Sequence, residues 1–133
     1  MSTRYGFTTS VAGGFEQVVE RVTQALKAEG FGVLTTIDAA ATLKNKLGVD
    51  MPRYLILGAC NPGFAHRALQ ADPDIGLLLP CNVVVREQPD KKINVGFMDP
   101  IAVLKLTDNP AITALAGEVR DKLERVRDKL VAN

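Results

Sequence analysis

The chain has 133 residues, of which 47% are hydrophobic and 23% are charged, and this is typical of a globular protein rather than a disordered one. Its 16 basic and 15 acidic residues leave a formal net charge of +1. Such a balance creates no field that attracts a polyanion, so nucleic-acid binding is disfavoured. The longest apolar region, residues 75–85, is broken by Gly76, Pro80 and Asn82 and is too short to span a bilayer. We expect one domain over residues 1–133, with neither a nucleic-acid nor a membrane partner.

The first thirty-odd residues predict strand, helix and strand in that order. Residues 5–10 are typical of a strand. From Phe15 onward, apolar residues recur at helical spacing with charged residues between them, and Gly30 is well placed to end that helix. Residues 31–37 then alternate between apolar and small or polar side chains, as in a strand with one buried face.

The middle of the chain continues this alternation of elements. Asp38 can cap a short helix that Gly48 ends, and residues 54–59 form a compact hydrophobic strand. A second helix is predicted directly after this strand. Asn61 can accept hydrogen bonds from its free N–H groups, and Pro62 at the first helical position loses no useful donor.

The last part of the chain predicts a hairpin and a long helix. Residues 75–86 are interpreted as one long strand or two collinear pieces, with Pro80 at an edge or bulge. Residues 93–97 alternate as its hairpin partner. Residues 101–106 are expected to be a short extended piece or a turn, and the Asn-Pro pair at 109–110 opens the longest helix.

The order of these elements indicates an α+β fold. We expect an antiparallel sheet covered on one face by the first and last helices, since each of these helices has one apolar stripe. The triplets Leu77–Leu79 and Val83–Val85 indicate that the other face of the sheet is also apolar. A second copy of the chain would cover such a face, and we therefore expect a homodimer.

Several segments together resemble a known family. They are "YGFTTSVAGGFEQVVERVTQALKAEGF", "ATLKNKLG", "ACNP" followed by "LLLPCNVVV", and a late "DP", and "CNP…PCN" is the most specific of them. The family is catalogued as domain of unknown function 302, and the likeness covers nearly the whole chain. The resemblance implies an α+β domain with a curved antiparallel sheet, similar to a single copy of the TATA-box-binding-protein fold, and a dimer. It implies no DNA binding here, because the charge balance provides no footprint for phosphates.

Two Cys-Asn elements are the most informative chemical feature of the sequence. Cys60 precedes Asn61 at a predicted helix start, where free N–H groups and the helix dipole would lower a thiol pKa. Cys81 follows Pro80 and precedes Asn82 inside an apolar strand, where no cap is needed. We expect the helix between the two cysteines to bring them into one pocket. The alternative is that both are small buried hydrophobes.

Cys60, His66 and Cys81 are the only cysteine and histidine residues of the chain. Two thiolates and one imidazole could form a transition-metal site with an open position. Their spacing matches no compact metal signature, and His66 is predicted to lie on the exposed face of its helix. An exposed helix histidine is therefore the favoured interpretation.

Three hypotheses of function follow. The first is a binding module for a small ligand or a metal, with its site at Cys60, Asn61, Pro80, Cys81 and Asn82. The second is a thiol-dependent redox or transfer enzyme, with Cys60 as nucleophile and Cys81 as resolving thiol. The third is a structural or partner-binding dimer whose cysteines only pack. The first residues lack the apolar core of a signal peptide, so we expect a cytoplasmic protein with free thiols.

Overall fold

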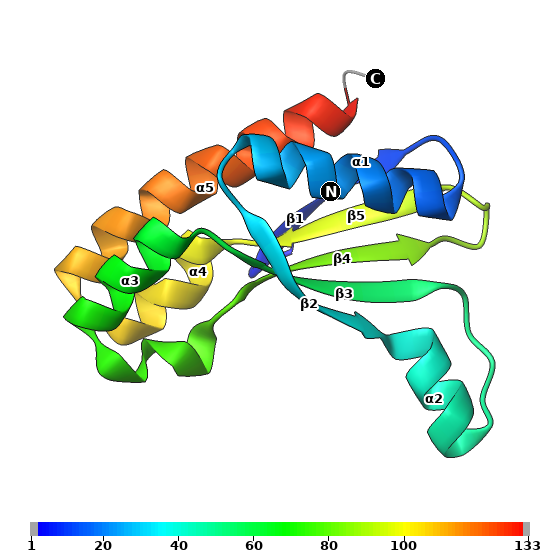
Figure 1. The fold of residues 1–133 in the computed structure, drawn as a ribbon, viewed down its shortest axis with the longest axis horizontal. Coiled ribbons are helices and arrows are strands. Elements are labelled where there is room, and N and C mark those ends of the chain that lie inside the picture. The colour runs from blue at the N-terminus through cyan, green and yellow to red at the C-terminus, as the bar shows by residue number, and fades with distance from the viewer. Residues whose placement is uncertain (1–2, 132–133) are drawn as a thin grey trace.

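The computed structural model describes residues 3–131 and contains a curved five-stranded antiparallel sheet (Figure 1). In spatial order the strands are β1 (Gly6–Val11), β5 (Ile93–Met98), β4 (Cys81–Glu87), β3 (Tyr54–Cys60) and β2 (Gly32–Asp38). Every neighbouring pair is antiparallel. The predicted α+β class and curved antiparallel sheet are confirmed.

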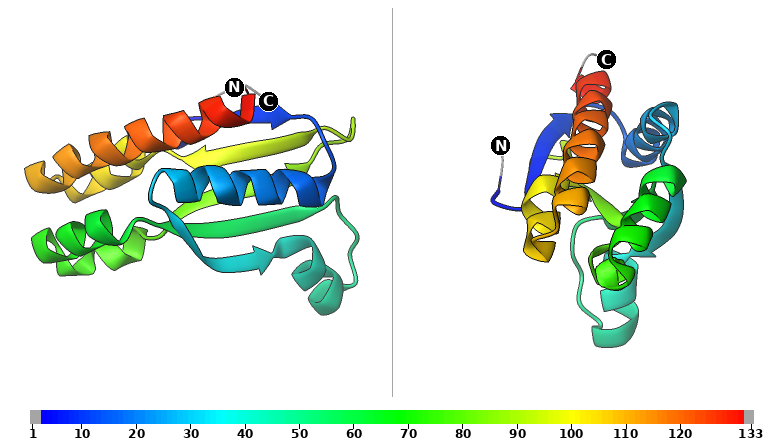
Figure 2. Two further views of the ribbon diagram at one scale, coloured as in Figure 1. Left: turned by 45° about the horizontal axis from the view of Figure 1, so that its top comes forward. Right: turned by 90° about the vertical axis from the view of Figure 1, so that its left-hand side faces the viewer.

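The helices cover one face and one end of this sheet. Helices α1 and α5 cross the covered face, α3 and α4 lie beyond the end of the sheet where β3 finishes and β4 begins, and α2 projects away from the other helices (Figures 1 and 2). Their bounds are α1 Phe15–Ala28, α2 Ala39–Leu47, α3 Pro62–Ala71, α4 Pro100–Leu104 and α5 Pro110–Val131. Two 3-10 helices follow α3 and α4, namely η1 (Pro73–Leu78) and η2 (Lys105–Thr107). No helix within residues 3–131 has the length and apolar character needed to cross a membrane.

The main core lies between the sheet and helices α1 and α5. Alternate residues of the strands point toward these helices, as the pleat of a strand requires. The fully buried side chains include Val18, Leu26, Val83, Val95 and Leu123. Burying one such side chain stabilises the folded chain by roughly 1.5 to 3 kcal/mol.

A second, smaller core lies beyond the end of the sheet. It consists of Ala68, Ile75, Leu104, Ile112, Leu115 and Ala116. The first half of α5 packs in this second core, and its second half, from Val119 onward, packs in the main core. One long helix therefore connects the two cores.

Three of the helices begin as the sequence predicts. The Oδ1 atom of Asp38 accepts a hydrogen bond from the Ala41 N–H at 2.9 Å, and Asn61 Oδ1 accepts one from the Phe64 N–H at 3.4 Å. Asn109 caps α5 in the same way. Gly48 ends α2 at a φ of 69°, a left-handed conformation that glycine adopts without steric cost.

Residues 75–80 are not part of a strand, so the prediction of a strand over 75–86 is wrong in its first half. Asp72 accepts a hydrogen bond from the Asp74 N–H and starts η1, which places Ile75 in the second core and leaves Leu77 87% exposed. Pro80 has no N–H to donate to a ladder, and β4 begins only at the next residue. The leucines of η1 therefore contribute nothing to the sheet.

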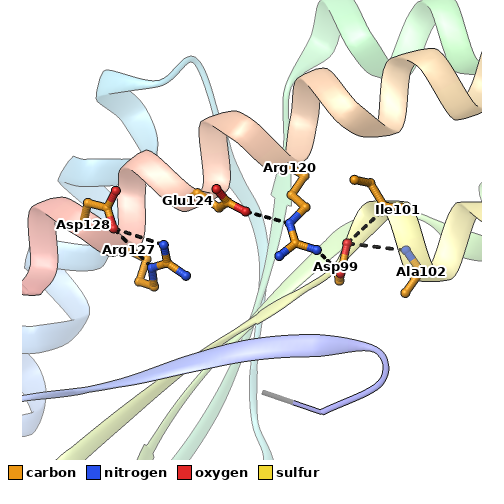
Figure 3. A network of polar contacts seen from close by, with 7 residues as sticks. All are labelled: Asp99, Ile101, Ala102, Arg120, Glu124, Arg127 and Asp128. Atoms are coloured by element: carbon orange, nitrogen blue, oxygen red, sulfur yellow. Dashed lines mark hydrogen bonds and ion pairs between the residues drawn. The ribbon is translucent and has the colours of Figure 1, made fainter. Parts of the chain in front are cut away.

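Residues 101–106 are also different from the prediction of an extended piece or turn. They belong to α4 and η2, because Asp99 accepts a hydrogen bond from the Ile101 N–H at 2.9 Å and Pro100 occupies the first helical turn. Arg120 of α5 contacts the other oxygen of Asp99 and donates to Glu124 at 2.7 Å (Figure 3). This network attaches α4 to the point where α5 passes between the two cores.

Candidate functional site

A cavity of about 350 Å³ lies where the two cores meet. Its lining residues come from β2 and the residue before it, from β3, α3, α4 and α5, and from the start of β4 and the segment before it: Phe31, Leu34, Thr35, Ala59, Cys60, Asn61, Phe64, Ala65, Ala68, Leu69, Leu79, Pro80, Cys81, Leu104, Leu115 and Val119. Four of the five predicted ligand-binding residues are therefore in one place. The fifth, Asn82, lies on the opposite face of the sheet and lines a different hollow.

Strand pairing explains why the two cysteines meet. In the antiparallel pair of β3 and β4, Ala59 lies opposite Cys81. Cys60 is the last residue of β3 and Cys81 is the first residue of β4, so both cysteines lie at the same end of the sheet. Asn61 then begins α3, which forms one wall of the cavity.

The two thiols lie in different surroundings. Cys81 is buried, with 8% of its surface exposed, whereas Cys60 is partly exposed, and both are free thiols. Burial, together with the nearby Cys60, raises the pKa of Cys81 to about 11. The Cys81 thiol is therefore protonated at neutral pH, which makes it a poor nucleophile and a poor metal ligand without proton loss.

Gly58 permits the close approach of chain segments beside the cavity. A Cβ atom at this position would lie 2.9 Å from Pro80 Cγ and would collide with the side chain of Thr35. Thr35 and Pro80 both line the cavity. The absence of a side chain at Gly58 thus lets β2 and the segment before β4 pack against the same face of β3.

None of the described residues that line the cavity is charged. Its polar groups are the hydroxyl of Thr35, the side chain of Asn61 and the two thiols, and all other lining residues are apolar. The Asn61 oxygen is engaged in capping α3. Such a wall favours a neutral apolar guest and disfavours an ion, whose desolvation nothing in the wall would offset.

His66 does not belong to this site. It is exposed on α3 and is not among the lining residues. Within residues 3–131, no three His, Cys, Asp or Glu side chains are arranged to hold a metal ion. The candidate metal site of Cys60, His66 and Cys81 is thus not assembled among the described residues, because His66 is exposed on α3 and does not line the cavity that holds the two thiols.

The apolar part of the wall was missing from the prediction. Phe64, Ala68 and Leu69 share one side of α3, and Leu115 and Val119 are one turn apart on α5. The sequence shows these residues as ordinary core positions. Only the meeting of two cores leaves a gap between them, and a periodic pattern contains no signal of such a gap.

Comparison with known proteins places these observations in a family. A crystal structure of an uncharacterized conserved protein DUF302 from Bacillus stearothermophilus matches 96% of this chain and 99% of its own, with a TM-score of 0.88 and 29% identity. An uncharacterized protein of Aquifex aeolicus (strain VF5) is 25% identical over 85 residues, which are 64% of this chain. The match covers 53% of that relative, about half its length. Residues 7–130 match the family described as domain of unknown function DUF302, as the "CNP…PCN" resemblance predicts, and the chain belongs to this family.

Proposed function

We propose that the protein is a binding module for a small, uncharged and mostly apolar molecule held in the cavity beside Cys60 and Cys81. The observation that carries this proposal is the convergence of Cys60, Asn61, Pro80 and Cys81 on a cavity of about 350 Å³ whose described lining residues are uncharged. This volume lies within the roughly 300 to 1,000 Å³ range of pockets that bind small molecules. The thiols and the Asn61 amide would supply the few polar contacts that orient the ligand.

A thiol-dependent enzyme is the weaker alternative. A resolving cysteine must reach its thiolate form to attack, and the raised pKa of Cys81, about 11, opposes this at neutral pH. Among residues 3–131, no histidine or carboxylate lines the cavity to accept a proton from either thiol. These two observations favour binding over thiol catalysis.

The proposal can be tested with N-phenyl-1-naphthylamine, an uncharged aromatic probe whose emission rises in apolar surroundings. The informative variant is Ala65→Leu, because Ala65 lines the cavity on α3 and a leucine there would occupy part of its volume. The matched control is Ala114→Leu on the exposed surface of α5. We expect the affinity to fall about tenfold or more in Ala65→Leu and to stay unchanged in the control.

A second variant tests the same cavity in case Ala65→Leu does not fold. Leu69 lines the cavity but is 43% exposed, so Leu69→Ala should enlarge the cavity at little cost in stability. A change in probe affinity with this variant would support the proposal even if Ala65→Leu unfolds. Equal affinity in all four proteins would overturn it.

The role of the thiols is tested separately with Cys60→Ser and Cys81→Ser. Serine has a similar shape, but its hydroxyl is more strongly hydrated and is a harder ligand. We expect weaker probe binding in the double variant than in the wild type. If the double variant retains full affinity, the ligand is held by the apolar wall alone, and the cysteines act only as core residues.

We also propose that the protein is a homodimer, with a contact surface different from the one the sequence indicates. The Leu77–Leu79 triplet is outside the sheet, whereas exposed apolar residues follow one another along edge strand β2, the projecting α2 and the segment after it: Leu34, Ile37, Leu43, Leu47, Val49 and Met51. Helix α2 has no buried residue. A second copy that covers this segment would remove its apolar surface from water. Location in the cytoplasm stays a prediction.

A further inference from the structure

A second hollow, of about 400 Å³, is lined by Asn82, Val84 and Arg86 of β4, which alternate with the core residues Val83 and Val85 and so lie on the face of the sheet opposite α1 and α5. It contains two asparagines, an arginine and two tyrosines over an apolar floor. Its lining residues are Thr3, Tyr5, Gly6, Phe7, Thr8, Tyr54, Asn82, Val84, Arg86, Asn94, Gly96, Phe97, Met98 and Val103. None of them takes part in the cavity at Cys60, so this hollow is a separate site.

Strand register arranges these side chains in rows across the sheet. Arg86 of β4 lies opposite Tyr54 of β3 on one side and opposite Asn94 of β5 on the other. In the next row, Val84 lies opposite Gly96. A polar row thus borders a row whose side chains are small or apolar.

Gly96 contributes no side chain to the lining of the hollow. Its partner across the β1–β5 pair is Thr8, and a Cβ atom at Gly96 would lie 3.3 Å from Thr8 Cγ2. A larger side chain at this position would fill the space between β1 and β4. The hollow therefore depends on a glycine in the interior of a strand, a position where glycine weakens the strand and often marks close approach of another group.

Arg86 and Asn94 bring two polar side chains into the hollow. Arg86 is partly buried, and among residues 3–131 no carboxylate pairs with its guanidinium. The described residues that line the hollow include no acidic side chain. Asn94 is 8% exposed, yet within residues 3–131 no side-chain N or O atom is both fully buried and without a hydrogen-bond partner. The polar end of Asn94 is therefore satisfied or open to solvent, and it lies in the hollow across the β4–β5 pair from the partly buried Arg86, where a ligand can contact both side chains.

We propose that this hollow binds a small organic carboxylate with an apolar body. The planar guanidinium of Arg86 presents two parallel N–H donors that match a carboxylate, and the Asn94 amide adds a donor beside it. The apolar body would lie over Gly96 against Val84 and Met98. A carboxylate fits the charge of the site, whereas a cation or a neutral hydrocarbon would leave Arg86 without a partner.

The test uses 2-naphthoate as the probe and 2-naphthamide as its neutral isostere. Titration of the ¹⁵N-labelled wild type with 2-naphthoate should shift the amide signals of Arg86, Asn94 and Gly96, and 2-naphthamide should bind there about tenfold more weakly or worse. Arg86→Met removes the charge and keeps the apolar stem. We expect this variant to lose roughly 10- to 100-fold in affinity for 2-naphthoate.

Arg67→Met is the matched control, because Arg67 forms an exposed ion pair with Glu118 on another part of the surface and its loss changes the net charge equally. This variant should bind 2-naphthoate like the wild type. Arg86→Lys keeps the positive charge but loses the planar pair of donors, so it should fold and show an intermediate affinity.

Three results would overturn the proposal. The first is equal 2-naphthoate affinity in Arg86→Met and Arg67→Met. The second is a set of shifted amides at Cys60 and Asn61, which would place the probe in the other cavity. The third is a change of subunit number in Arg86→Met by analytical ultracentrifugation, which would show that a second copy of the chain covers this face.

Discussion

Cys60 and Cys81 line the same cavity from the adjacent ends of two paired strands, and the proximity of Cys60 adds to the burial that raises the pKa of Cys81 to about 11. The two thiols are therefore neighbours that differ in their exposure to solvent. One is partly exposed at the start of a helix, and the other is buried within the sheet. This inequality leads to the first prediction.

Cys81 should react slowly with iodoacetamide at neutral pH, because the thiolate is the reactive form and little of it is present so far below the pKa. Its rate should rise steeply as the pH approaches about 11. Peptide mass analysis after timed alkylation measures both sites at once, with Cys60 as the internal comparison. Equal rates at Cys60 and Cys81 at neutral pH would contradict the burial of Cys81.

The same pKa shift predicts a loss of stability in alkaline solution. The unfolded chain releases the Cys81 proton near the ordinary value of 9.0, whereas the folded chain retains it to about pH 11. This contribution, about 2 to 3 kcal/mol, is fully present below pH 9 and is lost as the pH rises through about 11. Urea unfolding at about pH 8 and about pH 10.5 should show a smaller loss in Cys81→Ala than in the wild type.

Gly58→Ala should destabilise the protein by roughly 1 to 3 kcal/mol, because its methyl group would press against Thr35 and Pro80. Gly117→Ala is the control. Gly117 lies in α5 with open space where a Cβ atom would stand, so alanine there should stabilise the helix by about 0.5 to 1 kcal/mol. Chemical denaturation measures both changes. Effects of the same sign would show that Gly58 is not a close-packing position.

The dimer proposal predicts that Leu47→Lys lowers the mass in solution. Leu47 is 69% exposed on α2, and a lysine would place a charge in the contact between two copies. Leu106→Lys is a matched control, since Leu106 is 77% exposed at η2, away from that segment. Light scattering after size-exclusion chromatography compares the masses. A monomeric wild type, or dimers in both variants, would rule out residues 34–51 as the contact.

Native mass spectrometry of protein purified without chelator or reductant should show an organic adduct and no metal. The reason is that His66 lies away from Cys60 and Cys81, which leaves two thiols and no third ligand among the described residues. The same spectrum gives the subunit number and the oxidation state of the thiols. A metal that is lost in the Cys60→Ser and Cys81→Ser variants would favour a metal site after all.

The sequence alone determined the fold class, the helices α1, α2, α3 and α5, and most of the strands. Asn61 and Asn109 start helices for a local reason, since a side-chain oxygen and a following proline satisfy the first turn without help from the rest of the chain. The alternation in residues 93–97 likewise predicts a strand with one buried face, and β5 is that strand. These features depend on neighbours a few residues away, which a pattern can show.

The tertiary structure decided what no local pattern contains. The triplet Leu77–Leu79 has the composition of a strand, yet Ile75 is buried in a second core and this favours a helical turn. His66 shares a helix with Phe64, but the direction of each side chain is set by how α3 packs. Burial of Ile75 in the second core therefore decides the conformation of the Leu77–Leu79 segment against its strand-like composition.

The sequence marked both Cys-Asn elements, but only strand register brought Cys60 and Cys81 to one end of the sheet and sent Asn82 to the other face. In the same way, Arg86 and Gly96 are ordinary strand residues along the chain and form a hollow only because β4 pairs with β5. A site is made by side chains that are close in space, and sequence distance carries little information about that closeness once strands pair. The local pattern of the chain thus determined its fold class, and the pairing of its strands determined where a ligand can bind.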